Sequence, residues 1–294
     1  MRVVGSVMVV TIHATAPFVV AGSAIGATYW VALLGNELSR SAVPIFLAIS
    51  GWTLLTRTIR LRERLVRLLV PLAVWTAIYV GEATIRGDRS GSWVQDALFG
   101  PGVREHLWFF YFLIPIVVVV WLVRQPQPSW AYGAAGAFVV GFRSVAGVAQ
   151  AAAFWIGYAW GIGYVGVGYP ALEGRPPDPR LAWLLYAAAT AALVVGVRIY
   201  GVDSWPVSYA SPLVLVAAVA VIWGLRPVSR AMPLASLTLG VYLVHPLVLD
   251  VVTTLTSALR PELRLALDWG VAIPASFALV WVWHRSSKLS ALLG

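Results

Sequence analysis

Apolar residues dominate the chain in long runs that short polar stretches separate. The runs long enough to cross a membrane as helices are 3–24, 40–57, 68–85, 107–123, 130–147, 150–170, 181–200, 207–225, 234–257 and 266–285. A hydrocarbon core about 30 Å thick requires roughly 20 apolar residues of helix. The pattern therefore predicts an all-α fold, a polytopic transmembrane helical bundle with about ten spans.

Composition supports a membrane protein and excludes several kinds of chemistry. The 294 residues are 60% hydrophobic and only 11% charged, whereas soluble proteins average roughly 25% charged residues. The spans leave little room for a soluble domain, so residues 1–294 are predicted to form a single membrane-embedded domain. Cysteine is absent, which excludes disulfides and a cysteine nucleophile.

The net charge of +9 follows the predicted loops. With the N-terminus in the cytoplasm, thirteen of the 21 basic residues fall in cytoplasmic segments, together with only three of the 12 acidic residues. This asymmetry satisfies the positive-inside rule and predicts an N-in, C-in topology. The basic balance is therefore explained by the membrane, and we expect no nucleic-acid partner.

The first run carries an arginine and a histidine at helical spacing. Arg2 and His13 are eleven positions apart, so they share nearly one helix face and lie roughly 16 Å apart along the axis. An ionisable group deep in a bilayer is costly unless it faces a protein or water-filled interior, which makes His13 a site hypothesis. Alternatively, His13 only hydrogen-bonds a neighbouring helix. If the first run were a signal peptide cleaved near Ala24, His13 would be lost altogether.

The first cytoplasmic loop is rich in arginine. Arg60, Arg64 and Arg67 have i, i+4, i+7 spacing, so a helix would present them together. Guanidinium groups bind phosphate in bidentate fashion, which favours a ligand carrying several phosphates. The alternative is a topology signal that contacts anionic lipid headgroups.

Other polar residues interrupt or flank the apolar runs. Glu82 could orient a protonated histidine or an acceptor hydroxyl, or it could be a solvated interfacial residue. His245 precedes Pro246, which frees a backbone carbonyl that a side chain could bond, so a structural role is favoured. His106 fits an interfacial anchor as well as a site, and His284 receives no function.

Common catalytic signatures are missing. The chain has no phosphate loop, no dinucleotide fingerprint, no His-Glu-x-x-His and no Gly-x-Ser-x-Gly. We therefore expect neither a metal enzyme nor a nicotinamide enzyme.

Six short motifs, in order, resemble those of the acyltransferase-3 family of integral membrane acyltransferases. They are Arg2 with His13, Val43–Trp52, Arg64 and Arg67 before Pro71, His106–Phe109, Phe154–Gly161 and Thr238–His245. Two positions depart from the family pattern, because Thr238 replaces the usual serine and Trp52 the common tyrosine.

The resemblance implies an O-acyltransferase, an enzyme that transfers groups other than aminoacyl groups. It would move an acyl group, often acetyl, from cytoplasmic acyl-coenzyme A to a hydroxyl of an extracytoplasmic or lipid-linked carbohydrate. The expected location is the plasma membrane, and the expected partners are acyl-coenzyme A, a glycan or glycolipid acceptor and membrane lipids. His13 would act as general base or as an acyl-accepting nucleophile.

The candidate residues fall into three groups. The catalytic candidates are His13 and Glu82, and the candidates for binding coenzyme A are Arg2, Arg60, Arg64 and Arg67. The candidates for the substrate site are Ser50, Trp52, Tyr79, His106, Trp108, Tyr242 and His245. No metal ligand is expected.

Three alternatives remain open from the sequence. One is a proton-coupled permease that uses His13, Glu82 and His245, although no inverted repeat is evident. A second is acyl transfer to a non-carbohydrate acceptor. The third is a membrane component that has lost enzymatic activity.

Overall fold

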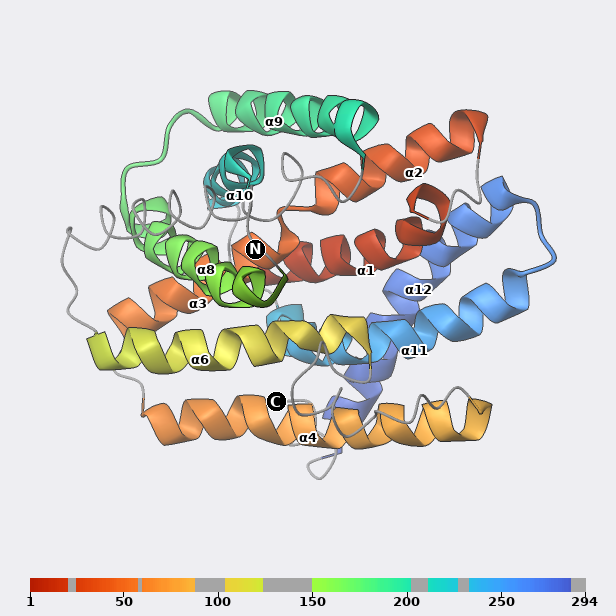
Figure 1. Ribbon diagram of the computed structural model, residues 1–294, viewed down its shortest axis with the longest axis horizontal. Helices are drawn as coiled ribbons and strands as arrows, with labels where there is room; N and C mark the ends of the chain where they lie inside the picture. Colours follow the sequence, from red (N-terminus) through yellow and green to blue (C-terminus); the bar gives the residue numbers. More distant parts are fainter. Residues whose placement is uncertain are drawn as a thin grey trace.

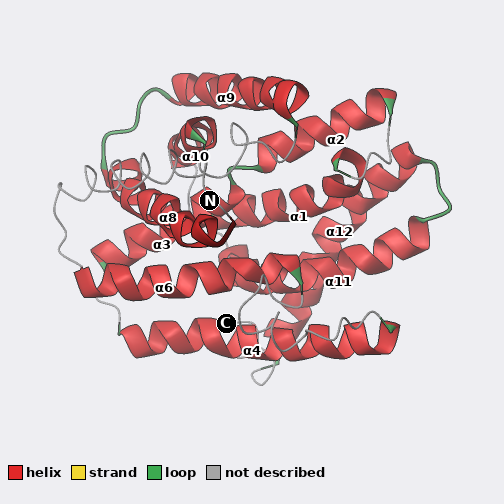
Figure 2. Cartoon of the chain, in the orientation of Figure 1, coloured by secondary structure: helices red, strands yellow, loops and turns green. Residues whose placement is uncertain are grey.

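The computed structural model describes residues 1–20, 25–57, 60–87, 104–123, 150–201, 211–226 and 233–286, and all regular structure in these ranges is helical (Figure 2). The α-helices are α1 Arg2–Val19, α2 Gly26–Ser39, α3 Ala42–Thr56, α4 Leu61–Arg86, α6 Trp108–Val123, α8 Gln150–Glu173, α9 Pro179–Tyr200, α10 Pro212–Leu225, α11 Thr238–Thr256 and α12 Pro261–His284. Two short 3-10 helices, η1 Glu105–Leu107 and η4 Pro233–Leu237, precede α6 and α11.

Several of these helices can cross a membrane. Within the described residues, six helical stretches are long and apolar enough, with α2 and α3 forming one of them, and α6 and α10 are shorter apolar helices. The all-helical, multi-pass membrane architecture is thus confirmed. The count of about ten spans and the N-in, C-in orientation stay predictions, and the predicted span 130–147 lies outside the described residues.

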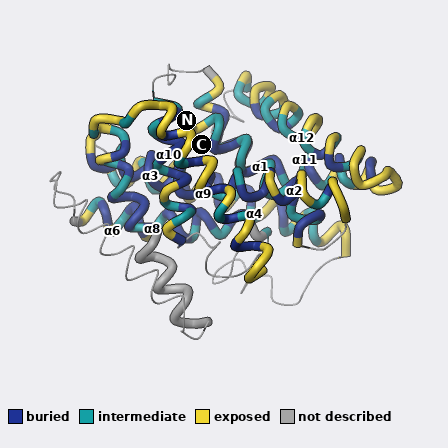
Figure 3. Tube along the Cα trace, turned by 90° about the horizontal axis from the view of Figure 1, so that it is seen from above, coloured by how far each residue is buried: buried dark blue, intermediate teal, exposed yellow. Residues whose placement is uncertain are grey.

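Helix α1 lies in the interior of the bundle. It packs against α2, α3, α11 and α12, with α9 on one side of it and α4 on the other in Figure 1. Buried residues run through the middle of the bundle, and exposed residues lie along the outer helices and turns (Figure 3). Many exposed side chains are large and apolar, such as Leu122, Leu184 and Leu255, as expected of helix faces that contact lipid.

The sequence-based spans missed helix α2. They ended the first span at residue 24 and began the second at residue 40, whereas α1 ends at Val19 and α2 occupies Gly26–Ser39. A turn at Arg40 separates α2 from α3. Glu37 and Arg40 form an ion pair of 2.7 Å there, and the Glu37 side chain is fully buried. Because the two charges neutralise each other, an apolar interior tolerates a segment that looks polar in the sequence.

Helix α4 begins earlier than the pattern predicted. It starts at Leu61 rather than at residue 68, so Arg64 and Arg67 belong to its first two turns. The helix continues through Pro71 to Arg86. The arginine spacing was therefore a better guide to the start of this helix than the hydrophobic run.

Helices α3 and α8 pack with their backbones in contact. A Cβ atom added at Gly51 would lie 2.2 Å from the carbonyl oxygen of Val165, and one added at Gly168 would lie 2.0 Å from that of Ala48. Small residues at such contacts allow close helix packing in membranes. Gly51, within the motif Val43–Trp52, thus has a structural function.

Candidate active site

Three histidines from separate parts of the chain converge inside the bundle. They are His13 on α1, His106 on η1 and His245 on α11. The ring centroid of His13 lies 4.9 Å from that of His245 and 6.5 Å from that of His106, and the latter two rings are 5.5 Å apart. In the part of the chain that the structure describes, no group of His, Cys, Asp or Glu side chains is arranged to hold a metal ion.

His13 lies at the wall of a cavity of about 430 Å³. The cavity is lined by His13, Ala14, Pro17, Arg104, His106, Pro246, Leu249, Asp250, Thr253 and Asp268. Helix α2 fixes the backbone beside His13, because the Asn36 amide donates to the Ile12 carbonyl at 3.3 Å and to the Thr15 hydroxyl at 3.0 Å. His13 is partly buried, whereas His106 and His245 are buried.

His245 is held by the backbone of its own helix. Its Nδ1 lies 2.7 Å from the carbonyl oxygen of Tyr242, four residues before Pro246, which has no N–H to bond that carbonyl. A carbonyl only accepts hydrogen bonds, so Nδ1 carries the proton and Nε2 of the neutral ring is unprotonated. Nε2 is buried, with no hydrogen-bond partner among the described residues.

Two tyrosines enclose His106. The Tyr79 ring lies 5.1 Å from the His106 ring, and the Tyr79 hydroxyl donates to the Leu243 carbonyl at 2.7 Å. The Tyr242 hydroxyl donates to the backbone carbonyl of His106. Burial, together with the neighbouring His13 and Arg104, lowers the pKa of His106 to about 3, so its imidazole is neutral near pH 7.

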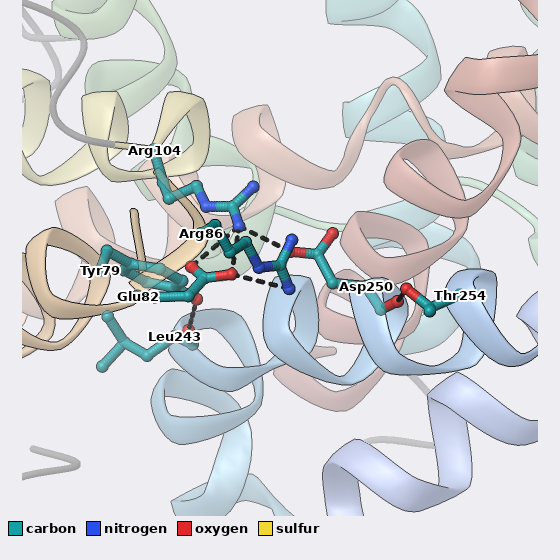
Figure 4. A network of polar contacts seen from close by, with 7 residues as sticks. All are labelled: Tyr79, Glu82, Arg86, Arg104, Leu243, Asp250 and Thr254. Carbon is teal, nitrogen blue, oxygen red and sulfur yellow. Dashed lines mark hydrogen bonds and ion pairs between the residues drawn. The ribbon is translucent and has the colours of Figure 1, made fainter. Parts of the chain in front are cut away.

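Four charged residues form an ion-pair network beside the histidines (Figure 4). Nη2 of Arg104 lies 2.7 and 2.8 Å from the two carboxylate oxygens of Glu82 and 2.6 Å from Oδ2 of Asp250. Arg86 pairs with the same two carboxylates at 2.9 and 3.5 Å. Arg104 also lies over the Tyr79 ring.

This network fixes the segment that carries His106. It joins α4 and α11 to Arg104, two residues before His106. Burial alone would lower the pKa of Arg104, but the carboxylates of Glu82 and Asp250 outweigh it and raise that pKa. Glu82 was predicted to orient a histidine or an acceptor hydroxyl. In the structure its carboxylate binds two guanidinium groups, which suits it to holding Arg104.

The other end of α1 lies among arginines. The Arg2 guanidinium is repelled by those of Arg57 and Arg64, and Arg64 is also repelled by Arg67. No described carboxylate pairs with Arg2, Arg64 or Arg67, and Nε of Arg64 is buried without a hydrogen-bond partner among the described residues. Arg60 is paired with Glu63 at 3.1 Å in an exposed position. Uncompensated positive charges at this spacing favour an anionic ligand.

The remaining predicted substrate-site residues do not line the cavity. Trp52 lies near the arginines, where its indole N–H donates to Glu173 at 2.6 Å and Arg57 covers its ring. Ser50 is buried beside Gly51, at the contact of α3 with α8. Trp108 packs its ring against those of Phe109 and Phe112 on α6. The structure therefore groups Tyr79, Tyr242 and the three histidines, and leaves these three residues elsewhere.

Sequence reasoning missed three residues of the cavity wall as site candidates: Arg104, Asp250 and Asp268. The two aspartates lie inside predicted apolar spans, and an ionisable residue at such a position is itself a site signal. Arg104 gives no such indication in the sequence, because it lies before a predicted span. Only the folded structure shows that it contacts Asp250.

A comparison with models of known protein families identifies the family of this chain. The acyltransferase-3 family model, described as an acyltransferase domain, matches residues 1–285. No curated protein and no solved structure gave a significant match. Because the family model covers nearly the whole chain, the protein belongs to the acyltransferase-3 family and is an acyltransferase.

Proposed function

We propose that this protein transfers an acyl group from cytoplasmic acyl-coenzyme A to a hydroxyl of an extracytoplasmic or lipid-linked carbohydrate in the plasma membrane. The observation that carries the proposal is the position of α1, which has uncompensated arginines around Arg2 at one end and His13 on a polar cavity toward the other. A donor with phosphates at one end and a thioester at the other matches this distribution.

The arginine cluster would bind the donor. Arg2, Arg64 and Arg67 are without carboxylate partners among the described residues, so they are available for the phosphates of coenzyme A. Arg60 contributes less, since it already pairs with Glu63. From Arg2 to His13 the helix rises roughly 16 Å, a length comparable with an extended pantetheine arm. Acetyl is the proposed acyl group, on the strength of the family resemblance.

His13 would serve as the general base. Its imidazole takes the proton of the acceptor hydroxyl while that oxygen forms a bond to the thioester carbonyl carbon. The carbon–sulfur bond then breaks, and the leaving thiolate of coenzyme A takes the proton from His13. Proton transfer by a positioned histidine typically contributes about 10²–10⁴-fold to the rate.

The cavity lining supports a polyhydroxylated acceptor. Arg104, Asp250, Thr253 and Asp268 place hydrogen-bonding groups around the space next to His13. A sugar offers several hydroxyls to such groups, whereas an apolar acceptor would leave them unpaired. The second candidate function is acyl transfer to a polar acceptor that is not a carbohydrate. The same polar lining favours such an acceptor over an apolar one.

The proposal predicts the effect of replacing His13. Purified His13→Ala should lose at least 99% of acyl transfer from labelled acyl-coenzyme A to a glycan acceptor, because only weak background catalysis remains without the base. Its affinity for coenzyme A, measured by calorimetry, should match that of the wild type.

Two results would count against this role. Retention of half of the wild-type turnover by His13→Ala would remove His13 from the chemistry. Stable labelling of the wild-type protein by acyl-coenzyme A without acceptor, absent in His13→Ala, would replace direct transfer with an acyl-histidine intermediate.

A further inference from the structure

Three carboxylates lie at the cavity or next to it, and they differ in how fully they are bonded. Glu82 and Asp250 each accept hydrogen bonds of 2.6 to 2.8 Å from Arg104. Asp268 on α12 has the hydroxyls of Thr253 and Thr256 and the guanidinium of Arg264 nearby, and Nε of Arg264 lies 3.8 Å from Oδ2, which is beyond hydrogen-bond distance.

Asp268 is nevertheless the most deeply buried of the three. Its side chain is 1% exposed, compared with 15% for Glu82 and 28% for Asp250. Oδ1 of Asp268 has no hydrogen-bond partner among the described residues, although Asp268 and Thr253 both form part of the cavity wall. A buried carboxylate oxygen without a donor is costly, and a ligand that supplies the donor recovers that cost.

The charges around the cavity limit the kind of ligand. Three guanidinium groups, those of Arg86, Arg104 and Arg264, balance the three carboxylates. A neutral ligand preserves this balance, whereas an anionic one would add a charge close to Asp268. His106, the histidine next to Arg104, adds no positive charge at neutral pH, because burial lowers its pKa to about 3.

We infer that Asp268 is an acceptor-binding residue, whose Oδ1 accepts a hydrogen bond from a hydroxyl of an uncharged, polyhydroxylated group on the acceptor. This inference rests on the proposed function and goes further, because it names the acceptor class and the residue that selects it. Asp268 binds and orients the acceptor next to His13 and exchanges no proton with it.

The test compares the wild type with Asp268→Asn, which keeps the shape of the side chain and removes its charge. A panel of neutral methyl hexosides and the corresponding methyl hexuronides serves as acceptors, with labelled acetyl-coenzyme A as donor. For the neutral hexoside that the wild type uses best, we expect the acceptor KM to rise about tenfold or more, as for the loss of a hydrogen bond to a charged group. The KM for acetyl-coenzyme A should stay within twofold. The preference for the neutral over the anionic acceptor should fall.

Glu37→Gln is the matched control. Glu37 is also a buried carboxylate that is paired with one arginine, and its Oε1 has no hydrogen-bond partner in the described part of the chain, but Glu37 does not line the cavity. Both variants should melt at lower temperature in detergent, and only Asp268→Asn should change the acceptor KM and the charge preference. Equal KM changes in both variants would reduce Asp268 to a structural role.

The remaining outcomes separate the two proposals. If the wild type acylates members of the panel and Asp268→Asn keeps the wild-type acceptor KM and charge preference, the inference about Asp268 is wrong and the proposed function stands. If the wild type acylates no hydroxyl in the panel, the carbohydrate acceptor is refuted, and the assignment of Asp268 is refuted with it.

Discussion

His106 illustrates how the interior of the bundle determines the state of a single residue. In an unfolded chain its pKa would be about 6.5, whereas burial in the folded protein lowers it to about 3. Between these values the unfolded state binds a proton that the folded state does not. The contribution of His106 to stability is therefore complete above pH 6.5 and decreases as the pH falls toward 3.

This difference predicts a pH-dependent loss of stability. Because His106 stays neutral in the folded state, the free energy of unfolding should be about 2 kcal/mol lower at pH 5 than at pH 7. This corresponds to roughly 1.4 kcal/mol for each pH unit below 6.5. Thermal unfolding in detergent at pH 7 and pH 5 should show a smaller decrease for His106→Gln than for the wild type. The same decrease in both proteins would show that His106 is protonated in the folded state.

The arginines at the other end of α1 give a second prediction for single residues. Replacing both Arg64 and Arg67 with alanine should weaken coenzyme A binding by about tenfold or more, because hydrogen bonds to charged groups contribute roughly 1.5–3 kcal/mol each. Calorimetry with coenzyme A measures this directly. Arg175→Ala is the control, since it removes an exposed arginine close to Glu173. Unchanged affinity in the double variant would assign the cluster to lipid contacts or topology.

Residue types and spacings pointed to some of the residues that the structure brings to the cavity, among them His13 and His106. The helical spacing of Arg2 and His13 and the proline next to His245 could be read from the sequence, because each depends on local helix geometry. The histidine cluster was not readable, since it depends on how α1, η1 and α11 meet. Asp268 was overlooked because it became a candidate only through its buried Oδ1, which has no hydrogen-bond partner among the described residues. The packed structure is needed to see this.

At the scale of elements, the break between α2 and α3 shows the limit of hydropathy. A hydropathy scale counts Glu37 and Arg40 as two charges, although the folded chain pairs them at 2.7 Å. The segment therefore looked like a loop between two spans.

The close contact of α3 with α8 gives a prediction for these elements. Gly168→Ala would place a methyl group 2.0 Å from the Ala48 carbonyl oxygen, so the helices must separate. Overpacking of this kind typically costs about 1–3 kcal/mol. Gly270→Ala on α12 is the control, because a Cβ there meets no atom within 4 Å. Equal melting temperatures for the two variants in detergent would contradict the close approach of the two helices.

On the scale of the whole molecule, the apolar runs predicted a helical membrane bundle correctly because length and hydropathy suffice for that conclusion. They did not predict which helices surround α1. In Figure 1, α3 ends and α4 begins at one end of the long axis, and α4 ends toward the other end, where the turn between α11 and α12 also lies. The arginines Arg64 and Arg67 and the cavity therefore lie toward opposite ends of the bundle.

Because the arginines and the cavity lie apart, we propose that the donor reaches the site from one face of the membrane and the acceptor reaches it from the other. Because the natural chain lacks cysteine, single substitutions can report its orientation. Arg175 lies close to Glu173, at the end of the bundle that carries the arginines, and Leu259 lies in the turn between α11 and α12. The two variants are Arg175→Cys and Leu259→Cys. Labelling with an impermeant maleimide in intact cells should modify only Leu259→Cys if the predicted N-in, C-in topology is correct.

The most direct measurement uses the protein reconstituted in sealed vesicles, with its orientation fixed by the same two cysteine variants. Acyl-coenzyme A is added to one face and a neutral glycoside acceptor to the other. We predict transfer only when acyl-coenzyme A is on the side of the membrane that Arg175 faces and the glycoside is on the side that Leu259 faces. Equal transfer with both substrates confined to one face would contradict a site that is reached from both sides.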